Sequence, residues 1–327
     1  MNSLSSISVV IPTRNRLESL NRVLLSISKQ TLAPKEIIIV DSSESPISIT
    51  ELAVQNSIQI IHSKPSVCLQ RNIGIEKSAS DYIFLCDDDI ELSENYCEML
   101  VRFLDEHAAE TIASGLVLEK DDENWTYCEK KMSGIGLVMA YVFGFSVGFD
   151  ANAIEQNQGF LTKKITNYYK NKGNRIAKSG WPIIVNFGGT VFQTPIYGLG
   201  ASIIRSEALR KVGFDEAFFA HGIGDNYDLS ISLKTAVNVI TEAKAYHHRE
   251  TTNRLQSEKA NRYRIHALHY ILVKHDRFRK INLVYFAWSL FGKSLVFLSK
   301  GKFKSVYYSF EVILRILSSQ PLYKVKN

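Results

Sequence analysis

The sequence lacks the signals of several common protein classes. Its four cysteines show no CxxC spacing, so the simplest interpretation is a reduced, cytosolic chain. No GxGxxG motif follows any predicted strand, which disfavours a dinucleotide-dependent dehydrogenase. No basic segment precedes the first apolar run, so this run predicts a strand rather than a secretion signal. The sequence also has no internal repeats.

What the chain does have is a globular composition with an uneven charge. It has 327 residues, of which 45% are hydrophobic and 22% charged, enough for one large domain or two modest ones. Residues 244–327 hold 17 Lys and Arg against 4 Asp and Glu, whereas the first 243 hold 22 against 29. A basic C-terminal region indicates an anionic partner, either nucleic acid or a membrane surface. We favour a membrane, because the basic residues interleave with long apolar runs.

Strand and helix patterns alternate along the first half of the chain. Short apolar runs predict strands at residues 7–11, 36–40, 58–61, 82–86 and 112–118. Helical spacing of apolar residues predicts helices at 17–27 and 66–79, and Ser93 can cap a third that runs to about residue 107. Farther along, residues 198–204 resemble a strand, 206–212 a helix, and successive helices follow residue 257. The pattern predicts an α/β fold, a mostly parallel sheet flanked by helices on both faces.

Polar clusters follow three of these strands. They are Pro12-Thr13-Arg14-Asn15, Asp41-Ser42-Ser43 and Asp87-Asp88-Asp89. Ligands of parallel α/β sheets bind beyond the carboxyl ends of the strands, so the clusters predict a nucleotide site. Taken singly, Asp41 also fits a turn cap, and the first cluster also fits a tight turn. Arg71 lies in a predicted helix that would reach the same face, although a lone arginine is often only a surface charge.

The acidic triplet indicates a metal site. Asp87 and Asp89 are one residue apart in an extended segment, so both can face one ion while Asp88 faces elsewhere. Oxygen ligands suit Mg²⁺ or Mn²⁺, which also hold substrate phosphates. The alternative is a solvated acidic turn. His247 and His248 are further candidates for a metal ligand, or else surface residues.

A second carboxylate pair opens a helix after Gly224. Asp225 and Asp228 lie on one helix face near the positive end of its dipole. One of them can act as a general base that takes a proton from an acceptor hydroxyl. Asp225 also fits a simple N-cap.

Several of these segments together resemble family 2 glycosyltransferases of the GT-A fold, of the bacterial surface-polysaccharide type. The segments are VVIPTRNR, IIIVDSSES, RNIGIEKSASDYIFLCDDDIEL, GLGASIIRSEALRKVGFDEAF, GDNYDLSISLK and YHHRE. The resemblance implies a GT-A domain over residues 1–250, with a nucleotide-sugar-binding half at 1–118 and an acceptor half at 119–250. Residues 251–327 would form a basic amphipathic helical tail. The implied activity is inverting transfer of a sugar from a nucleoside diphosphate to an acceptor hydroxyl, such as that of a lipid-linked glycan in surface polysaccharide synthesis.

The resemblance also implies residue roles. The residues expected to bind the donor are Pro12, Thr13, Arg14, Asp41, Arg71, Asp87 and Asp88. Asp87 and Asp89 correspond to the DxD motif, and with one of His247 and His248 they would hold Mn²⁺ or Mg²⁺. The family commonly has a Glu-Asp pair, with the second acid as base, where this sequence has Asp225-Asn226. Asn226 cannot act as a base, so the role falls to Asp225, which we favour, or to Asp228.

Two other functions also have some support in the sequence. A metal-dependent nucleotidyltransferase would also use carboxylates, but the segment after the first strand lacks the glycines of a phosphate loop. A catalytically impaired, membrane-docked scaffold is supported only by Asn226.

Two apolar stretches bear on localisation. Residues 281–298 contain one lysine and have basic residues on both sides, which favours a helix lying at the surface of an anionic bilayer. The alternative is a helix packed on the catalytic domain or in a dimer contact. Residues 132–149 carry no charge and fit either a buried hairpin or a second membrane-contacting element. We therefore expect a cytoplasmic protein, peripheral on the inner face of the cell membrane.

Overall fold

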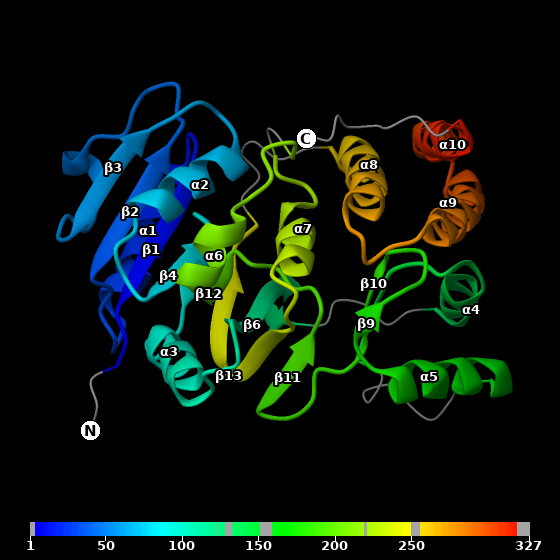
Figure 1. Cartoon of the computed structure of the whole chain (residues 1–327), viewed down its shortest axis with the longest axis horizontal. Helices are drawn as coiled ribbons and strands as arrows, with labels where there is room; N and C mark the ends of the chain where they lie inside the picture. Colours follow the sequence, from blue (N-terminus) through cyan, green and yellow to red (C-terminus); the bar gives the residue numbers. More distant parts are fainter. Residues whose placement is uncertain are drawn as a thin grey trace. The chain divides into compact units, whose positions relative to one another are not determined.

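The chain divides into two compact units, of which the computed structural model describes residues 4–121, 123–127, 133–150, 159–218, 221–249 and 256–318. Unit 1 comprises residues 1–127 and 189–254, and unit 2 comprises residues 128–188 and 255–327. Residues 128–188, which the sequence analysis assigns to the acceptor half, thus form one compact unit with the C-terminal helices. Figure 1 shows the elements of both units along the chain.

Unit 1 is built on one mixed sheet. Its main strand order is β11-β13-β6-β12-β4-β1-β2-β3. These strands are β1 (Ile7–Thr13), β2 (Glu36–Asp41), β3 (Ile58–His62), β4 (Tyr82–Cys86), β6 (Ile112–Asp121), β11 (Val191–Thr194), β12 (Ala201–Arg205) and β13 (Val237–His247). Two short strands, β5 (Ile90–Leu92) and β7 (Asn124–Thr126), pair with β13 and β6 respectively.

The strand directions determine where the polar clusters lie. β1 pairs in parallel with β2 and β4, and β2 with β3, so the clusters after β1, β2 and β4 reach the same edge. β12 runs antiparallel between β4 and β6, and its first residue, Ala201, pairs with Cys86 at the end of β4. The segment before β12 therefore reaches the same edge as the acidic triplet. The α/β class predicted from the sequence is confirmed.

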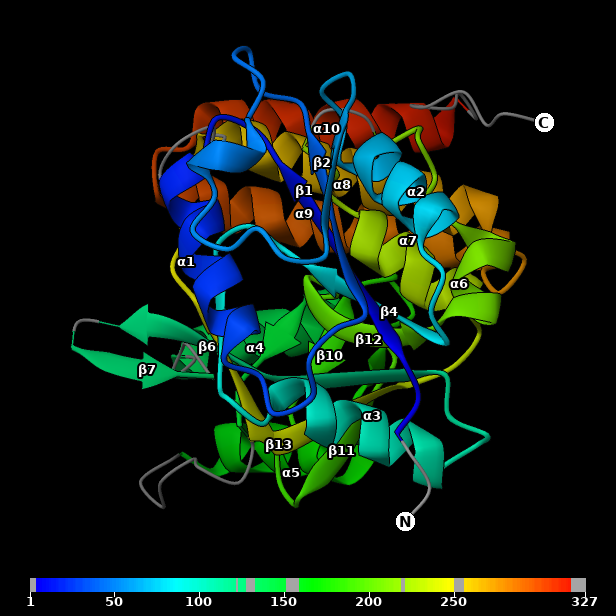
Figure 2. The same ribbon diagram turned by 90° about the vertical axis from the view of Figure 1, so that its left-hand side faces the viewer.

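Helices cover both faces of this sheet. Helix α1 (Leu17–Ser28) buries its apolar residues in one hydrophobic core with α3 (Tyr96–Glu106). Helix α2 (Val67–Lys77) packs on the opposite face, where a Cβ on Gly74 would lie only 2.3 Å from a methyl carbon of Val10. Figure 2 shows α1 on one side of β1 and β2, and α2 on the other side with α6 (Ser206–Val212) and α7 (Asp225–Ser232). Helix α3 begins at Tyr96 after Asn95, so the prediction that Ser93 caps it was wrong.

Unit 2 is mainly helical. Its helices are α4 (Gly134–Phe143), α5 (Phe160–Lys172), α8 (Ser257–Lys274), α9 (Lys280–Ser299) and α10 (Phe303–Leu317). A small sheet of order β8-β10-β9 consists of β8 (Val147–Gly148), β9 (Arg175–Ile176) and β10 (Pro182–Ile184). Its core includes Leu137 and Phe143 from α4 and Tyr169 from α5. Because residues 134–143 are helical, the buried hairpin considered for 132–149 is wrong; Met132 itself lies outside the described residues.

Candidate active site

The site of unit 1 forms at the carboxyl edge of β1, β2 and β4. Thr13 ends β1, Asp41 ends β2, and the acidic triplet follows β4. The backbone N–H of Asp87 donates to the carbonyl of Gly200, 2.8 Å away, which joins the triplet to the segment before β12. The fold thus brings together clusters that are separated by tens of residues in the sequence.

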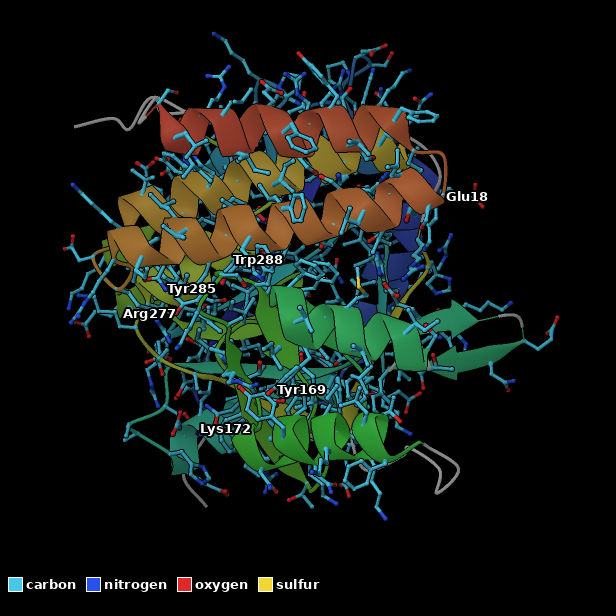
Figure 3. The ribbon with its side chains drawn as sticks, turned by 90° about the vertical axis from the view of Figure 1, so that its right-hand side faces the viewer. Glu18, Tyr169, Lys172, Arg277, Tyr285 and Trp288 are labelled. Atoms are coloured by element: carbon cyan, nitrogen blue, oxygen red, sulfur yellow. The ribbon has the colours of Figure 1, made fainter. Side chains whose placement is uncertain are left out.

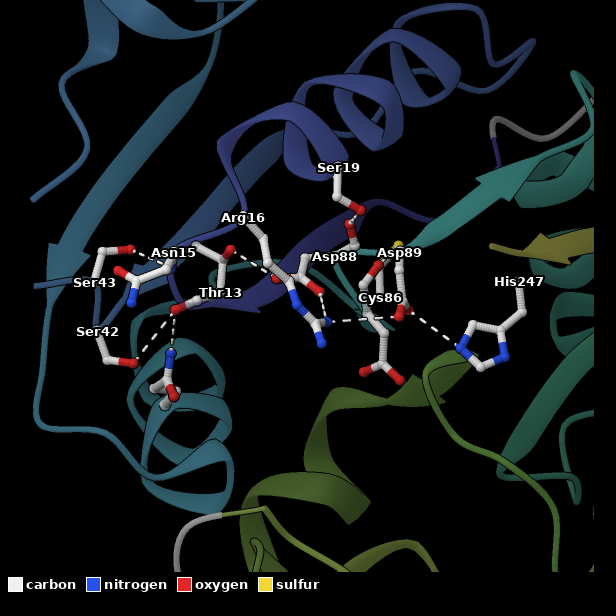
Figure 4. Close-up of polar contacts among 12 residues, drawn as sticks. Thr13, Asn15, Arg16, Ser19, Ser42, Ser43, Cys86, Asp88, Asp89 and His247 are labelled. Carbon is white, nitrogen blue, oxygen red and sulfur yellow. Dashed lines mark hydrogen bonds and ion pairs between the residues drawn. The ribbon is translucent and has the colours of Figure 1, made fainter. Parts of the chain in front are cut away.

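Asp88 is the buried member of the triplet. Its carboxylate accepts hydrogen bonds from the Thr13 hydroxyl (2.8 Å) and from Nη1 of Arg16 (2.9 Å). The same Arg16 nitrogen lies 3.5 Å from Asp89, so one guanidinium stands between two carboxylates (Figure 4). Burial raises the pKa of Asp88 to about 6, against the opposing effect of Arg16. Asp88 therefore points to the start of α1. Residues 88 and 89 form a turn rather than an extended segment, so the side chains do not alternate as the sequence predicted: Asp89 shares Arg16 with Asp88.

Arg71 links the acidic triplet to helix α7. Its Nη2 lies 2.6 Å from Oδ1 of Asp87, and its Nη1 lies 2.5 Å from Oδ2 of Asp225. The guanidinium also stacks over the ring of Phe214, 5.0 Å from its centroid. Burial alone would lower the pKa of Arg71, but Asp87 and Asp225 outweigh it and raise the pKa above its ordinary value. This arginine is a fixed positive charge between two carboxylates.

Asp225 is held by a second donor. Its side chain is 8% exposed, and its Oδ1 accepts the backbone N–H of Asn226 at 2.6 Å. Burial raises the pKa of this carboxyl to about 6, while Arg71 opposes the shift. At neutral pH the group is therefore mostly ionised but can still take a proton. Asp228, also buried, lies in the first turn of the same helix.

Asp41 organises the loop that follows β2. Its two carboxylate oxygens accept the backbone N–H groups of Ser43 (2.8 Å) and Ile47 (3.0 Å), and Nδ1 of the half-exposed His62 lies 3.4 Å away. The side chain of Gln70, which the sequence did not single out, donates to the carbonyls of Thr13 (2.9 Å) and Val40 (2.7 Å). It ties the ends of β1 and β2 together beneath the loop.

The remaining residues of the first cluster differ in their exposure. Pro12 is buried within β1, whereas Arg14 is exposed and lies 3.5 Å from Glu44. Asn15 adopts a left-handed conformation (φ 53°) and bonds the β2 loop, with its N–H 2.7 Å from the Ser43 hydroxyl. The first cluster is thus a turn fastened to the second, with Arg14 presented at its surface.

The two adjacent histidines point in different directions. Nε2 of His247 lies 3.4 Å from Oδ1 of Asp89 (Figure 4). Its Nδ1 lies 3.2 Å from Glu119 of β6. The side chain of His248 instead lies 2.8 Å from Glu91 and against the ring of Trp125. Only the side chain of His247 thus meets a carboxylate of the acidic triplet, whereas His248, which follows the end of β13, donates its backbone N–H to the carbonyl of Asp89 at 3.0 Å.

The donor set fits a divalent cation in part. Asp89 and His247 supply a carboxylate oxygen and an imidazole nitrogen at a separation that two ligands of one ion would have. Asp87, by contrast, directs Oδ1 to Arg71. Over the residues that the structure describes, no group of three His, Cys, Asp or Glu side chains is placed to hold an ion by itself. A metal here would need oxygens of a bound ligand to complete its shell.

Gly200 is a site residue that the sequence analysis did not identify individually. A Cβ at this position would lie 2.0 Å from Oδ2 of Asp87, closer than any real contact. Gly198, two residues earlier, has nothing within 4 Å of such an atom. The signal was present in the GLGAS string, but the pairing of β12 with β4 was needed to show which glycine faces the carboxylate.

The comparison with known families identifies the chain. The model of glycosyl transferase family 2 matches residues 8–176, which is more than half of the chain. The chain belongs to this family. Among curated proteins, this family 2 chain is 38% identical over 99 residues to the uncharacterized glycosyltransferase YwdF of Bacillus subtilis (strain 168). It is 31% identical over 134 residues to an uncharacterized glycosyltransferase of Rickettsia bellii (strain RML369-C).

The matched segments are only parts of these proteins. They cover 29% and 40% of this chain, and 37% and 19% of the two relatives. Among solved structures, a crystal structure of GalNAc-T7 with UDP, GalNAc and Mn²⁺ matches 100% of this chain and 60% of its own, with a TM-score of 0.59 and 14% identity. The family 2 chain therefore has the GT-A fold that its sequence predicted.

Proposed function

We propose that this family 2 chain transfers a sugar from a nucleoside diphosphate to an acceptor hydroxyl with inversion at the anomeric carbon. The observation that carries the proposal is the convergence of Asp87 and Asp225 on Arg71, beside the buried Asp88. The acidic groups that would bind the donor thus lie next to a base candidate for the acceptor hydroxyl, within unit 1. Family membership supports the reaction class, and GalNAc-T7, which shares the fold, was solved with UDP, GalNAc and Mn²⁺.

The donor is proposed to bind along the carboxyl edge of the sheet. Thr13, Asp41 and the exposed Arg14 border the part of the edge nearest to β1 and β2, where the nucleoside would lie. Asp87 and Arg71 border the part nearest to α7, where the sugar would lie. Arg71 offers charge to the donor while it keeps Asp225 oriented.

Asp89 and His247 would hold a divalent cation, and oxygens of the bound diphosphate would complete its shell. Such a cation would offset the negative charge of the leaving diphosphate. GalNAc-T7 supports this cofactor proposal through its Mn²⁺, without indicating which ion this chain takes. Arg16 would remain between Asp88 and Asp89 and limit the repulsion between the acids.

Asp225 is the proposed base. In an inverting transfer the acceptor oxygen bonds to the anomeric carbon as the bond to the diphosphate oxygen breaks, and a base takes the acceptor proton. With a pKa near 6, Asp225 is ionised at neutral pH and can accept this proton. Asp228, in the same turn of α7, is the alternative.

The acceptor is proposed to be a lipid-linked glycan in surface polysaccharide synthesis, used at the cytoplasmic face of the cell membrane. The support is the basic, aromatic and apolar character of residues 256–318 of unit 2. By length and composition, the helix over Lys280–Ser299 is long and apolar enough to cross a membrane, and 28% of its apolar stretch is buried. An anionic membrane surface would then be a partner of this unit.

A thermal-shift screen tests the reaction class. The purified chain is heated with UDP, GDP, dTDP and CDP, each with and without Mn²⁺. A nucleotide at about 100 times its Kd stabilises by about 2.7 kcal/mol, so a shift for one nucleotide that needs Mn²⁺ is expected. Asp89→Asn should lose this shift, and His248→Ala, which alters a histidine turned away from Asp89, should keep it. No shift for any nucleotide from a well-folded sample would contradict the proposal and favour the scaffold.

A further inference from the structure

Helix α9 exposes a continuous apolar stripe. The residues on this stripe recur about every three or four positions, apart from the adjacent Val284 and Tyr285. All are at least 38% exposed: Ile281, Val284, Tyr285, Trp288, Phe291, Leu295 and Leu298. Figure 3 shows Tyr285 and Trp288 on α9, with α10 running beside it. An exposed apolar stripe of this length is unusual for a protein surface in water.

Helix α10 exposes its large apolar residues and buries small polar ones. Its exposed face is lined by Phe303, Tyr307, Phe310, Leu314 and Leu317, which are 43% to 75% exposed. Its buried face carries Ser305 and Ser309 together with Val312. A helix that packs on a water-soluble core normally shows the opposite arrangement, with large apolar residues inside.

Small residues also line part of the buried face of α9, which carries Phe286 and Leu290 as well. Ser289, Gly292 and Ser294 are buried there, and a Cβ on Gly292 would lie 2.1 Å from the ring of Phe143. The hydroxyl of Ser294 donates to the carbonyl of Leu290 (2.9 Å) within its own helix. Small, internally bonded residues between helices and large apolar residues outside are the pattern of helices that pack within lipid.

Trp288 and α4 widen the same surface. The indole N–H of Trp288 donates to the carbonyl of Val142 at 3.0 Å, while 47% of the residue remains exposed. Val142 and Ile135 of α4 are themselves 51% and 80% exposed. An indole with a satisfied N–H and an exposed ring suits the boundary between headgroups and acyl chains.

The charges of this region lie where a bilayer requires them. Lys293, the one charged residue of α9 between Ile281 and Leu298, places its ammonium 3.4 Å over the ring of Trp181, in the core of the unit. Glu311 of α10 is partly buried and lies near Arg262, His266 and Arg315. Exposed basic residues stand at both ends of α9: Arg277, Arg279, Lys280, Lys300, Lys302 and Lys304.

We propose that the hairpin of α9 and α10, extended by α4, inserts its exposed apolar face into the acyl region of an anionic bilayer. The basic ends of α9 would contact anionic headgroups, and the apolar stripes would lie below them. Charge complementarity favours this occupant over a second copy of the chain, since six basic side chains border the face. The inference deepens the proposed function, because a lipid-linked acceptor would be met at this surface.

Vesicle flotation tests the surface. The full chain is floated with vesicles of phosphatidylcholine, with or without phosphatidylglycerol. The double variant L298E/L314E should bind about 100-fold more weakly, since each buried leucine is worth about tenfold or more. Leu25→Glu, at a similarly exposed leucine of α1, is the matched control and should bind like the unaltered chain. K300E/K302E should lose only the part of vesicle binding that depends on phosphatidylglycerol.

Vesicles that contain brominated lipid test how deeply the apolar face inserts. Acyl-chain bromines should quench tryptophan fluorescence of the bound chain, and Trp288→Phe should remove most of the quenching. Flotation without quenching would overturn insertion. A lipid-free dimer that L298E/L314E dissociates, with no flotation of the unaltered chain, would assign the face to self-association instead. Metal-dependent nucleotide binding, measured on the same samples, separates a failure of docking from a failure of the proposed reaction.

Discussion

The Arg71 guanidinium is bonded to the Asp225 carboxylate, 154 positions later in the chain, with Nη1 2.5 Å from Oδ2. The other terminal nitrogen of Arg71 bonds Asp87. The base candidate is therefore fixed to the acidic triplet through one buried cation. Loss of Arg71 should therefore affect both carboxylates.

We expect Arg71→Met to destabilise the fold and abolish transfer. Removing one partner of a buried ion pair leaves carboxylates without compensation, which costs about 3–5 kcal/mol. Urea unfolding measures this loss. Arg102→Ala, which breaks an exposed pair with Glu98, is the control and should cost less than about 1 kcal/mol. Equal stability losses for the two variants would show that the Arg71 link does not support the fold.

Asp225→Asn should spare donor binding and remove turnover. The amide keeps the shape of the side chain but cannot accept a proton as a base. In the unaltered chain, turnover should rise as pH increases through about 6, because the carboxylate is the active form. Stopped assays over this pH range, with binding measured in parallel, check both points. Should Asp225→Asn keep normal turnover and Asp228→Asn lose it, the base is Asp228.

Stability should fall as pH rises from about 4 to about 6. The folded pKa of Asp88 is raised from 3.8 to about 6, so the folded chain keeps a proton in this window that the unfolded chain has lost. The stabilisation is complete below the unfolded pKa and is lost as pH passes the folded pKa. Asp225 has the same shift and adds to the effect. Urea titrations at several pH values should show that Asp88→Asn reduces the pH dependence of the free energy of unfolding. An unchanged pH dependence would show that Asp88 does not carry a raised pKa in the folded chain.

Gly200→Ala should lower activity sharply, because the added methyl group would displace the Asp87 carboxylate. Gly198→Ala has open space around the new atom and should leave activity near that of the unaltered chain. The measurement is the transfer rate of each variant at a temperature at which both remain folded. Similar rates would show that Asp87 tolerates a shift.

His247→Ala should weaken Mn²⁺-dependent nucleotide binding, while His248→Ala should not. Only the side chain of His247 reaches the Asp89 carboxylate, and loss of one ligand from so small a set is costly. Calorimetric titration of nucleotide with and without Mn²⁺ separates the metal-dependent part. Equal behaviour of the two variants would place the metal elsewhere or make it unnecessary.

Much of unit 1 could be predicted from local patterns. The strands over residues 7–13, 36–41 and 82–86 contain the short apolar runs predicted at 7–11, 36–40 and 82–86, and nearly all of their residues are buried. Such runs can be recognised without knowledge of the neighbouring strands. The apolar residues of α1 recur at helical spacing and are buried as expected. The hairpin considered for residues 132–149 was wrong, because an uncharged apolar run carries too little periodicity to separate strand from helix.

The α/β class, the polar clusters after the strands and the family of the chain follow from residues that lie close together in the sequence, so local patterns were enough to predict them. Three contacts, by contrast, became visible only in the folded chain: Arg71 joins Asp87 to Asp225, the side chain of His247 rather than that of His248 faces Asp89, and Gly200 lies against Asp87. The structure also showed that α10 turns its serines inward and its aromatic residues outward. These contacts depend on strand order and helix facing, which arise from pairings between distant segments and leave no local pattern to read.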